Sequence, residues 1–154
     1  MTMDPYGQWM GTPMDEGEVD DLLQSSGWGV VSLADGDDPY SLPISFGYTD
    51  DAVYFAFIQD SPTNTKVEFI EDGTTARLLV TDVRARFDWQ SVAVTGPVEA
   101  VDPEGDRWDV LHDSLADNAW FSTDFERAPS VRGLQGWRLD PDEVRGLEVR
   151  PDDA

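Results

Sequence analysis

The feature that most constrains the fold is a strict alternation of large and small side chains between Tyr40 and Tyr48. Successive side chains of a strand point to opposite faces. One face therefore carries the bulky residues Leu42, Ile44, Phe46 and Tyr48. The other carries the small residues Ser41, Pro43, Ser45 and Gly47. The bulky face suits a hydrophobic core. The small face either meets water or leaves room for a flat ligand, and the alternation alone does not choose between these.

Further segments rich in β-branched and aromatic residues, bounded by turn residues, predict more strands. They are residues 28–33, 52–58, 76–81, 89–101, 135–139 and 144–149. Gly96-Pro97 lies inside the longest of them and predicts a kink, because both residues weaken a strand interior. Amphipathic patterns predict helices over 15–24, 65–71 and from Asp102 or Pro103 to Asp117, the last with Trp108, Leu111 and Leu115 on one side.

Six or seven short strands, mostly antiparallel, with three inserted helices indicate a mainly β (α+β) protein built on a small barrel. The barrel is expected to close, because open sheet edges promote aggregation. We expect an irregular arm over 1–14, one folded domain over 15–150 and an acidic tail over 151–154. The charged stretch 82–88 is expected to connect two strands, and 121–132 is expected to be a loop.

Composition excludes several classes of function. The chain of 154 residues has no cysteine and one histidine, so disulfides, thiol catalysis and histidine or thiolate metal sites are not expected. The formal net charge of −22 disfavours binding to nucleic acid or to anionic lipid. No segment approaches the roughly 20 apolar residues of a membrane-spanning helix. No signal peptide is recognisable, and a cytoplasmic location is expected.

The acidic excess has a second consequence. Aspartate outnumbers glutamate and lysine is almost absent, a composition similar to that of haloarchaeal proteins. Concentrated salt shortens the Debye length to about 3 Å at 1 M and so screens repulsion between surface carboxylates. We expect folding or assembly to weaken in dilute buffer.

Lys66 is the only lysine in the chain. It follows a loop rich in hydroxyl and amide side chains and stands near the start of a predicted helix. Unpaired N–H groups at a helix start, together with an ammonium group, suit a phosphate. The alternative is an ordinary solvated surface lysine.

These segments in succession resemble the pyridoxamine 5′-phosphate oxidase-like family, which has the FMN-binding split β-barrel fold. The resemblance is carried by Gly27-Trp28-Gly29-Val30-Val31-Ser32-Leu33, by the stretch from Pro39 to Tyr48, by Val53-Tyr54-Phe55-Ala56-Phe57, by Lys66, and by the stretch from Trp89 to Gly96. It covers residues 15–117 well and the C-terminal third loosely. It implies a six- to seven-stranded antiparallel split β-barrel.

The resemblance also implies a homodimer that holds FMN between its subunits. Pro43 and Ser45 would border the flavin ring, and Ser91 with Gln90 would approach it. Lys66, Thr65 and a hydroxyl from Ser61 or Thr63 would hold the phosphate. Trp137 and Arg138 would contact the cofactor from the second subunit. The structural alternatives are an ordinary strand hydroxyl for Ser91 and a core position for Trp137.

The chain also departs from the family pattern. The Arg-x-His element that the vitamin-processing oxidases use for substrate phosphate is absent, and no arginine lies at 61–66. A deazaflavin could therefore replace FMN. We expect an FMN-dependent oxidoreductase or flavin reductase using a small-molecule electron donor. The alternatives are a non-enzymatic flavin- or deazaflavin-binding protein, serving as a sensor or store, and a barrel that has lost its cofactor. No residue is nominated as a general acid or base.

Overall fold

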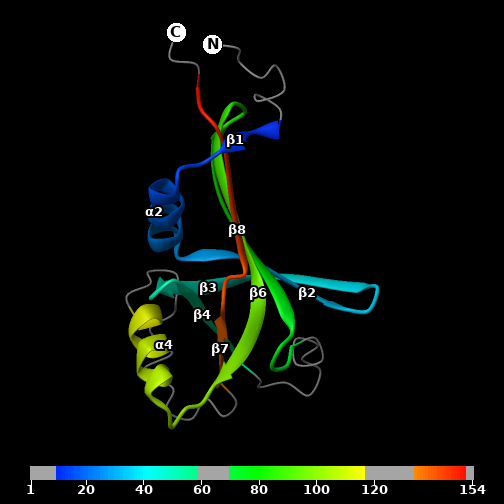
Figure 1. The fold of residues 1–154 in the computed structure, drawn as a ribbon, viewed down its shortest axis with the longest axis vertical. Helices are drawn as coiled ribbons and strands as arrows, with labels where there is room; N and C mark the ends of the chain where they lie inside the picture. The colour runs from blue at the N-terminus through cyan, green and yellow to red at the C-terminus, as the bar shows by residue number, and fades with distance from the viewer. Residues whose placement is uncertain (1–9, 59–69, 117–133, 152–154) are drawn as a thin grey trace.

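The computed structural model describes residues 10–58, 70–116 and 134–151 of the chain. These ranges hold eight strands and two helices (Figure 1). The strands are β1 (Thr12–Pro13), β2 (Trp28–Asp35), β3 (Asp38–Thr49), β4 (Ala52–Ile58), β5 (Thr75–Ala85), β6 (Asp88–Val101), β7 (Leu134–Leu139) and β8 (Glu143–Val149). The helices are α2 (Glu16–Ser26) and α4 (Asp106–Ala116).

Six of the strands close into an antiparallel barrel. Their order is β6-β5-β2-β3-β4-β7, and β7 pairs again with β6. β8 adds to the free half of β6, and β1 pairs with β8. The predicted split β-barrel of mainly β (α+β) class is therefore confirmed, with two strands added outside the closed ring.

β6 changes its pairing partner at the predicted kink. Its first half pairs with β8, from Trp89 to Thr95, and its second half pairs with β7, from Val98 to Val101. Gly96 and Pro97 stand between the two halves. The connection from β7 to β8 crosses β6 there, because the N–H of Asp140 donates to the Pro97 carbonyl at 3.0 Å. One long strand thus joins the barrel to the outer sheet.

The core follows the alternation that the sequence predicts for β3. Ile44 and Phe46 are buried, and Leu42 and Tyr48 pack against the same cluster. The inward residues of β2, β5 and β6 complete it, with Trp137 of β7 and the buried side of α2. A second cluster lies under α4, where Leu111 and Leu115 are fully buried.

Several boundaries differ from the sequence prediction. α4 starts at Asp106, because the Asp102 carboxylate accepts a hydrogen bond from the Glu104 N–H and holds the preceding residues in a turn. The charged stretch 82–88 is largely strand: β5 runs to Ala85 and β6 starts at Asp88. α2 extends two residues further, to Ser26.

Some predicted elements lie outside the described residues. These are most of the predicted helix 65–71 and the predicted loop 121–132. Within the three described ranges, no helix is long and apolar enough to cross a membrane.

Candidate functional site

The small face of β3 lies on the outside of the barrel. Ser45 stands directly opposite Trp28 of β2, and Pro43 stands opposite Val30. Pro43 is exposed and Ser45 is half-buried. Because these side chains are short, the outer surface of β3 is shallow at this point, as the sequence predicts.

The same outer surface continues across three neighbouring strands. Val30 pairs with Leu79 of β5, and Leu79 pairs with Ala93 of β6. Ser91 lies two residues from Ala93 and so points to the same side. The structure therefore places Pro43, Ser45 and Ser91 on one surface. β2 and β5 lie between β3 and β6, so the path from Ser91 to the Ser45 strand is about 14 Å along the curved sheet, at a strand spacing of about 4.8 Å.

This outer surface is poor in acidic groups, which is unusual for a chain with a net charge of −22. The outward residues on the central parts of β5 and β6 are Arg77, Leu79, Thr81, Ser91, Ala93 and Thr95. Two large apolar side chains are exposed on it: Trp28 at 42% and Leu79 at 39%. Among the described residues, the central part of this surface carries no carboxylate and exposes two large apolar side chains, which suits an uncharged ring system or another protein surface.

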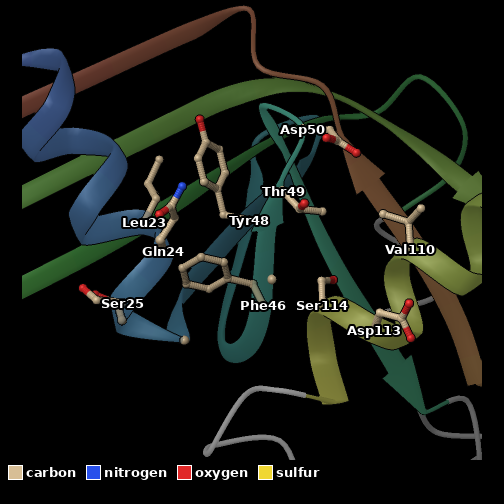
Figure 2. Close-up of a pocket in the computed structure, with 13 residues that line it drawn as sticks. Leu23, Gln24, Ser25, Phe46, Tyr48, Thr49, Asp50, Val110, Asp113 and Ser114 are labelled. Carbon is tan, nitrogen blue, oxygen red and sulfur yellow. The ribbon is translucent and has the colours of Figure 1, made fainter.

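A cavity of about 630 Å³ opens beside this surface (Figure 2). α2 and the end of β3 form one side of it, and α4 forms the other. Gly27 and Phe46, the neighbours of Trp28 and Ser45 in the chain, are among its lining residues and are joined by a backbone hydrogen bond of 3.0 Å. Gly47, two residues from Ser45 and on the same face of β3, also lines the cavity, so the cavity begins next to the shallow surface on that face.

Two glycines give the cavity its shape. Gly27 ends α2 with a φ of +77°, a left-handed conformation that glycine adopts without a Cβ clash. Gly47 lies under α4, where a Cβ would overlap the Ser114 side chain. These two residues let α2 turn into β2 and let α4 lie close on β3.

The cavity lining carries negative charge. Asp50 and Asp113 contribute carboxylates, and no described lining residue is basic. Ser25 and Ser114 add hydroxyl groups, although each of them also donates to a carbonyl of its own helix. The cavity favours an uncharged or cationic group and disfavours a phosphate.

Tyr48 is held in its protonated form at the edge of the cavity. Its hydroxyl donates to Asp20 at 3.2 Å and to Asp51 at 3.5 Å. Burial, and then the charges of these two carboxylates, raise the pKa of Tyr48 to about 12. Tyr48 is therefore protonated at neutral pH, its one proton is shared by these two carboxylates, and it is not a base.

Gln90 lies on the opposite side of β6 from Ser91, since neighbouring strand residues alternate. Its amide donates to Glu18 at 3.2 Å and to Glu148 at 3.1 Å. Arg150 pairs with the same two carboxylates. The hydrogen bond from Arg150 lowers the pKa of Glu18, and these bonds raise the pKa of Arg150. Gln90 thus ties α2, β6 and β8 together.

The two C-terminal residues predicted from the family pattern lie on β7. Trp137 is 1% exposed in the barrel core, the alternative that the sequence analysis left open. Within the described ranges its indole N–H has no hydrogen-bond partner. Arg138 is mostly covered and lies 3.6 Å from Asp140. The predicted phosphate ligands Ser61, Thr63, Thr65 and Lys66 lie outside the described residues.

Sequence reasoning did not single out Trp28 as a site residue. The sequence could have identified it, because Trp28, Val30 and Ser32 are two residues apart along β2 and so point to the same, outward side. The helix residues of the cavity gave no such signal.

Residues 15–148 match the model of a family described as pyridoxamine 5′-phosphate oxidase. The chain belongs to this family. Its fold is also that of several solved structures, each of low sequence identity. The FAD-binding protein from Mycobacterium smegmatis is 19% identical with a TM-score of 0.66, over 91% of this chain and 99% of that one.

Two other structures are similar to the same degree. An FAD-binding protein from Mesorhizobium loti is 22% identical with a TM-score of 0.67, over 89% of this chain and 96% of that one. The flavocytochrome Anf3 from Azotobacter vinelandii is 18% identical with a TM-score of 0.65, over 97% of this chain and 72% of that one. A search of curated proteins found no match.

Proposed function

We propose that this protein is a flavin-binding oxidoreductase or flavin reductase that uses FMN for hydride transfer. The observation that carries the proposal is the shallow outer surface around Pro43 and Ser45, on which the described neighbours Trp28 and Val30 carry no charge, in a chain that belongs to a flavin-binding family. A flat, uncharged ring fits a surface of short side chains bordered by apolar ones.

The residues present fit the two ends of the cofactor differently. The ring end suits Pro43 and Ser45, with Trp28 exposed beside Ser45 and Leu79 exposed one strand further away, on β5. The phosphate end needs a cation, and the sole lysine, Lys66, is the predicted ligand together with Thr65 and Ser61 or Thr63. The acidic cavity next to the ring surface disfavours a phosphate. The phosphate is therefore assigned to the Lys66 segment.

When bound, FMN supplies the hydride-transfer chemistry, and the protein supplies binding, orientation and a surface that excludes water. Pro43 and Ser45 support one side of the ring. The cavity between α2 and α4 gives the reacting end of a small donor or acceptor a place beside it, and its carboxylates favour an uncharged end, such as the dihydronicotinamide of NADH or NADPH, over a phosphate.

We propose that two copies of the chain form the active unit. Support comes from the same outer surface, which leaves Leu79 and Val83 exposed at 39% and 69%. Its central rows on β5 and β6 carry no carboxylate, so two copies could meet there without like-charge repulsion. Sedimentation equilibrium in molar KCl tests this, and a monomer at all concentrations would exclude it.

A non-enzymatic flavin- or deazaflavin-binding protein is the second candidate. It is favoured by the side chains that stand opposite Ser45 and Pro43, which are Trp28 and Val30, because neither of them can transfer a proton. Two of the compared structures are of FAD-binding proteins, so FAD belongs in the test as well.

The test begins with protein purified in molar KCl and titrated with FMN, FAD and a deazaflavin, with binding followed by visible absorption. NADH or NADPH is then added without oxygen. Bleaching supports the reductase, and a bound flavin that no donor bleaches supports the binding protein. Lys66→Ala should weaken FMN binding at least about tenfold, because a charge-assisted phosphate contact is lost.

Arg84→Ala is the matched control for loss of one positive charge, since Arg84 is exposed and pairs only with Asp82 among the described residues. It should leave FMN binding unchanged. Wild-type protein that binds none of the three cofactors would overturn the proposed function.

A further inference from the structure

Trp28 occupies an unusual position for a large aromatic residue. It is the first residue of β2, it directly follows the left-handed Gly27, and its side chain is 42% exposed. Across the strand pair it faces Ser45, and two residues further on Val30 faces Pro43. A broad indole therefore stands beside two short side chains on the outer surface.

Because the side chain of Trp28 is much longer than that of Ser45, the outer surface stands higher at Trp28 than at Ser45. Side chains directly opposite each other on paired strands have Cβ atoms about 4.5–5.5 Å apart. An indole extends well beyond a serine side chain, so a planar molecule lying on Ser45 and Pro43 would meet Trp28 at its side. Aromatic rings attract one another in offset or edge-to-face arrangements.

Trp28 also lies next to the cavity between α2 and α4. Gly47, which follows Ser45 on the same face of β3, and Gly27, which precedes Trp28, both line the cavity between α2 and α4. Trp28 thus stands where the shallow surface meets the cavity. A residue at this junction would fix how far a ring reaches toward a molecule held in the cavity.

We propose that Trp28 is the positioning residue for the flavin ring: its indole packs against the ring that lies on Pro43 and Ser45. This inference rests on the proposed function and assigns to that site an aromatic wall from β2. The wall acts on the ring and not on the phosphate. Loss of Trp28 should therefore weaken all flavins equally, whether or not they carry a phosphate.

Riboflavin, which has the ring but no phosphate, separates this role from that of Lys66. Riboflavin and FMN are titrated into wild-type protein, Trp28→Ala, Trp28→Phe and Lys66→Ala in molar KCl. Trp28→Ala should raise both dissociation constants by the same factor, about tenfold for one lost stacking contact, and Trp28→Phe should recover part of it. Lys66→Ala should affect FMN and spare riboflavin.

A spectroscopic readout accompanies the affinities. An indole in contact with the ring quenches flavin fluorescence, so flavin bound at saturation should be brighter in Trp28→Ala than in wild type. Val144→Ala is the matched control, because Val144 is an apolar residue of β8 that is 44% exposed and pairs with the buried Val94, on the side of the sheet away from Ser91 and Leu79. It should change neither affinity nor brightness. Thermal unfolding of each variant shows that it is folded.

The outcomes separate the two proposals. Wild-type protein that binds no flavin overturns the proposed function and this inference with it. Wild-type protein that binds flavin while Trp28→Ala binds riboflavin equally well, with unchanged fluorescence, overturns the role of Trp28 alone. A Trp28→Ala variant that loses only self-association, with flavin binding intact, also overturns it, because Trp28 would then belong to a protein interface.

Discussion

Gly96 lies directly against the backbone carbonyl of Asp140. A Cβ added to Gly96 would overlap that carbonyl oxygen. The N–H of Asp142 also donates to the Thr95 carbonyl at 2.9 Å, so the connection between β7 and β8 is tied to β6 on both sides of the glycine. This crossing is where the closed barrel and the outer sheet separate.

Gly96→Ala should therefore lower the free energy of unfolding by about 1–3 kcal/mol or more, because the obstacle is backbone and cannot rotate away. Urea denaturation in molar KCl measures it. Gly17→Ala is the control: Gly17 is in α2, a Cβ there would meet no atom within 4 Å, and alanine should stabilise the helix by up to about 1 kcal/mol. If Gly96→Ala and Gly17→Ala were equally stable, the close approach of the Asp140 carbonyl to Gly96 would be contradicted.

The crossing was foreseeable from the sequence, because a Gly-Pro pair inside a strand pattern is a local signal. The inward face of β3 was foreseeable for the same reason. The strand character of Asp82–Ala85 was missed, because the pairing of Val83 with Trp89 outweighs a polar, charged composition. Tertiary pairing of this kind leaves little trace in a single segment.

Some features of the candidate site could also be predicted from the sequence, and others could not. The shallow surface of Pro43 and Ser45 follows from period-two alternation. The same rule shows that Gln90 and Ser91 cannot share a face, a consequence that the family pattern obscured. The cavity needs the ends of α2 and α4 to meet over β3, and this depends on the close approach of Gly47 to Ser114. No local pattern encodes such a meeting.

A single substitution in the turn between β3 and β4 should raise the free energy of unfolding. Asp50 and Asp51 have φ values of 53° and 58°, the left-handed region in which residues with a Cβ are strained. Two positive φ values in a two-residue hairpin loop favour glycine at the second position. Asp51→Gly should raise the free energy of unfolding by about 1 kcal/mol in molar KCl.

Asp51→Ala separates backbone strain from charge. It removes the same carboxylate and the same contact with Tyr48 but keeps a Cβ at positive φ. Alanine should therefore be less stable than glycine at this position. An alanine variant as stable as the glycine variant would assign the effect to charge instead.

The Tyr48 hydroxyl predicts an alkaline transition. Its pKa is raised from 10.0 to about 12, so the folded state holds the proton more tightly than the unfolded state. A raised pKa contributes stability that is complete below pH 10 and is lost as the pH rises toward 12. Ultraviolet absorption should show one tyrosine ionising late, and Tyr48→Phe should remove that phase. A Tyr48→Phe titration identical to the wild type would contradict the assignment.

Arg150 should matter more than its exposure indicates. Glu148 is 7% exposed and lies in the same network as Glu18, and Arg150 pairs with both carboxylates. Arg150→Gln leaves two neighbouring carboxylates without their cation and should lower stability at neutral pH. Because the pKa of Glu18 lies below its usual 4.5, the wild type loses this contribution as the pH falls below that value.

The difference between wild type and Arg150→Gln should therefore shrink on acidification. Arg145→Gln is the control, since Arg145 is exposed and reaches Glu143 only at 4.0 Å. Such a surface pair contributes little. Chemical denaturation of the three proteins across the acid range measures the effect. Equal losses for Arg145→Gln and Arg150→Gln would show that the network adds nothing beyond surface charge.

Salt dependence should be large and should act through screening. With 32 acidic against 10 basic residues, unpaired carboxylates repel one another in the folded chain. The Debye length falls from about 30 Å at 0.01 M to about 3 Å at 1 M, so the melting temperature should rise with KCl over this range. Low concentrations of guanidinium chloride should first stabilise the protein, because this denaturant is also a salt, whereas urea should only destabilise it. Equal melting temperatures in millimolar and molar KCl would exclude the expected salt adaptation.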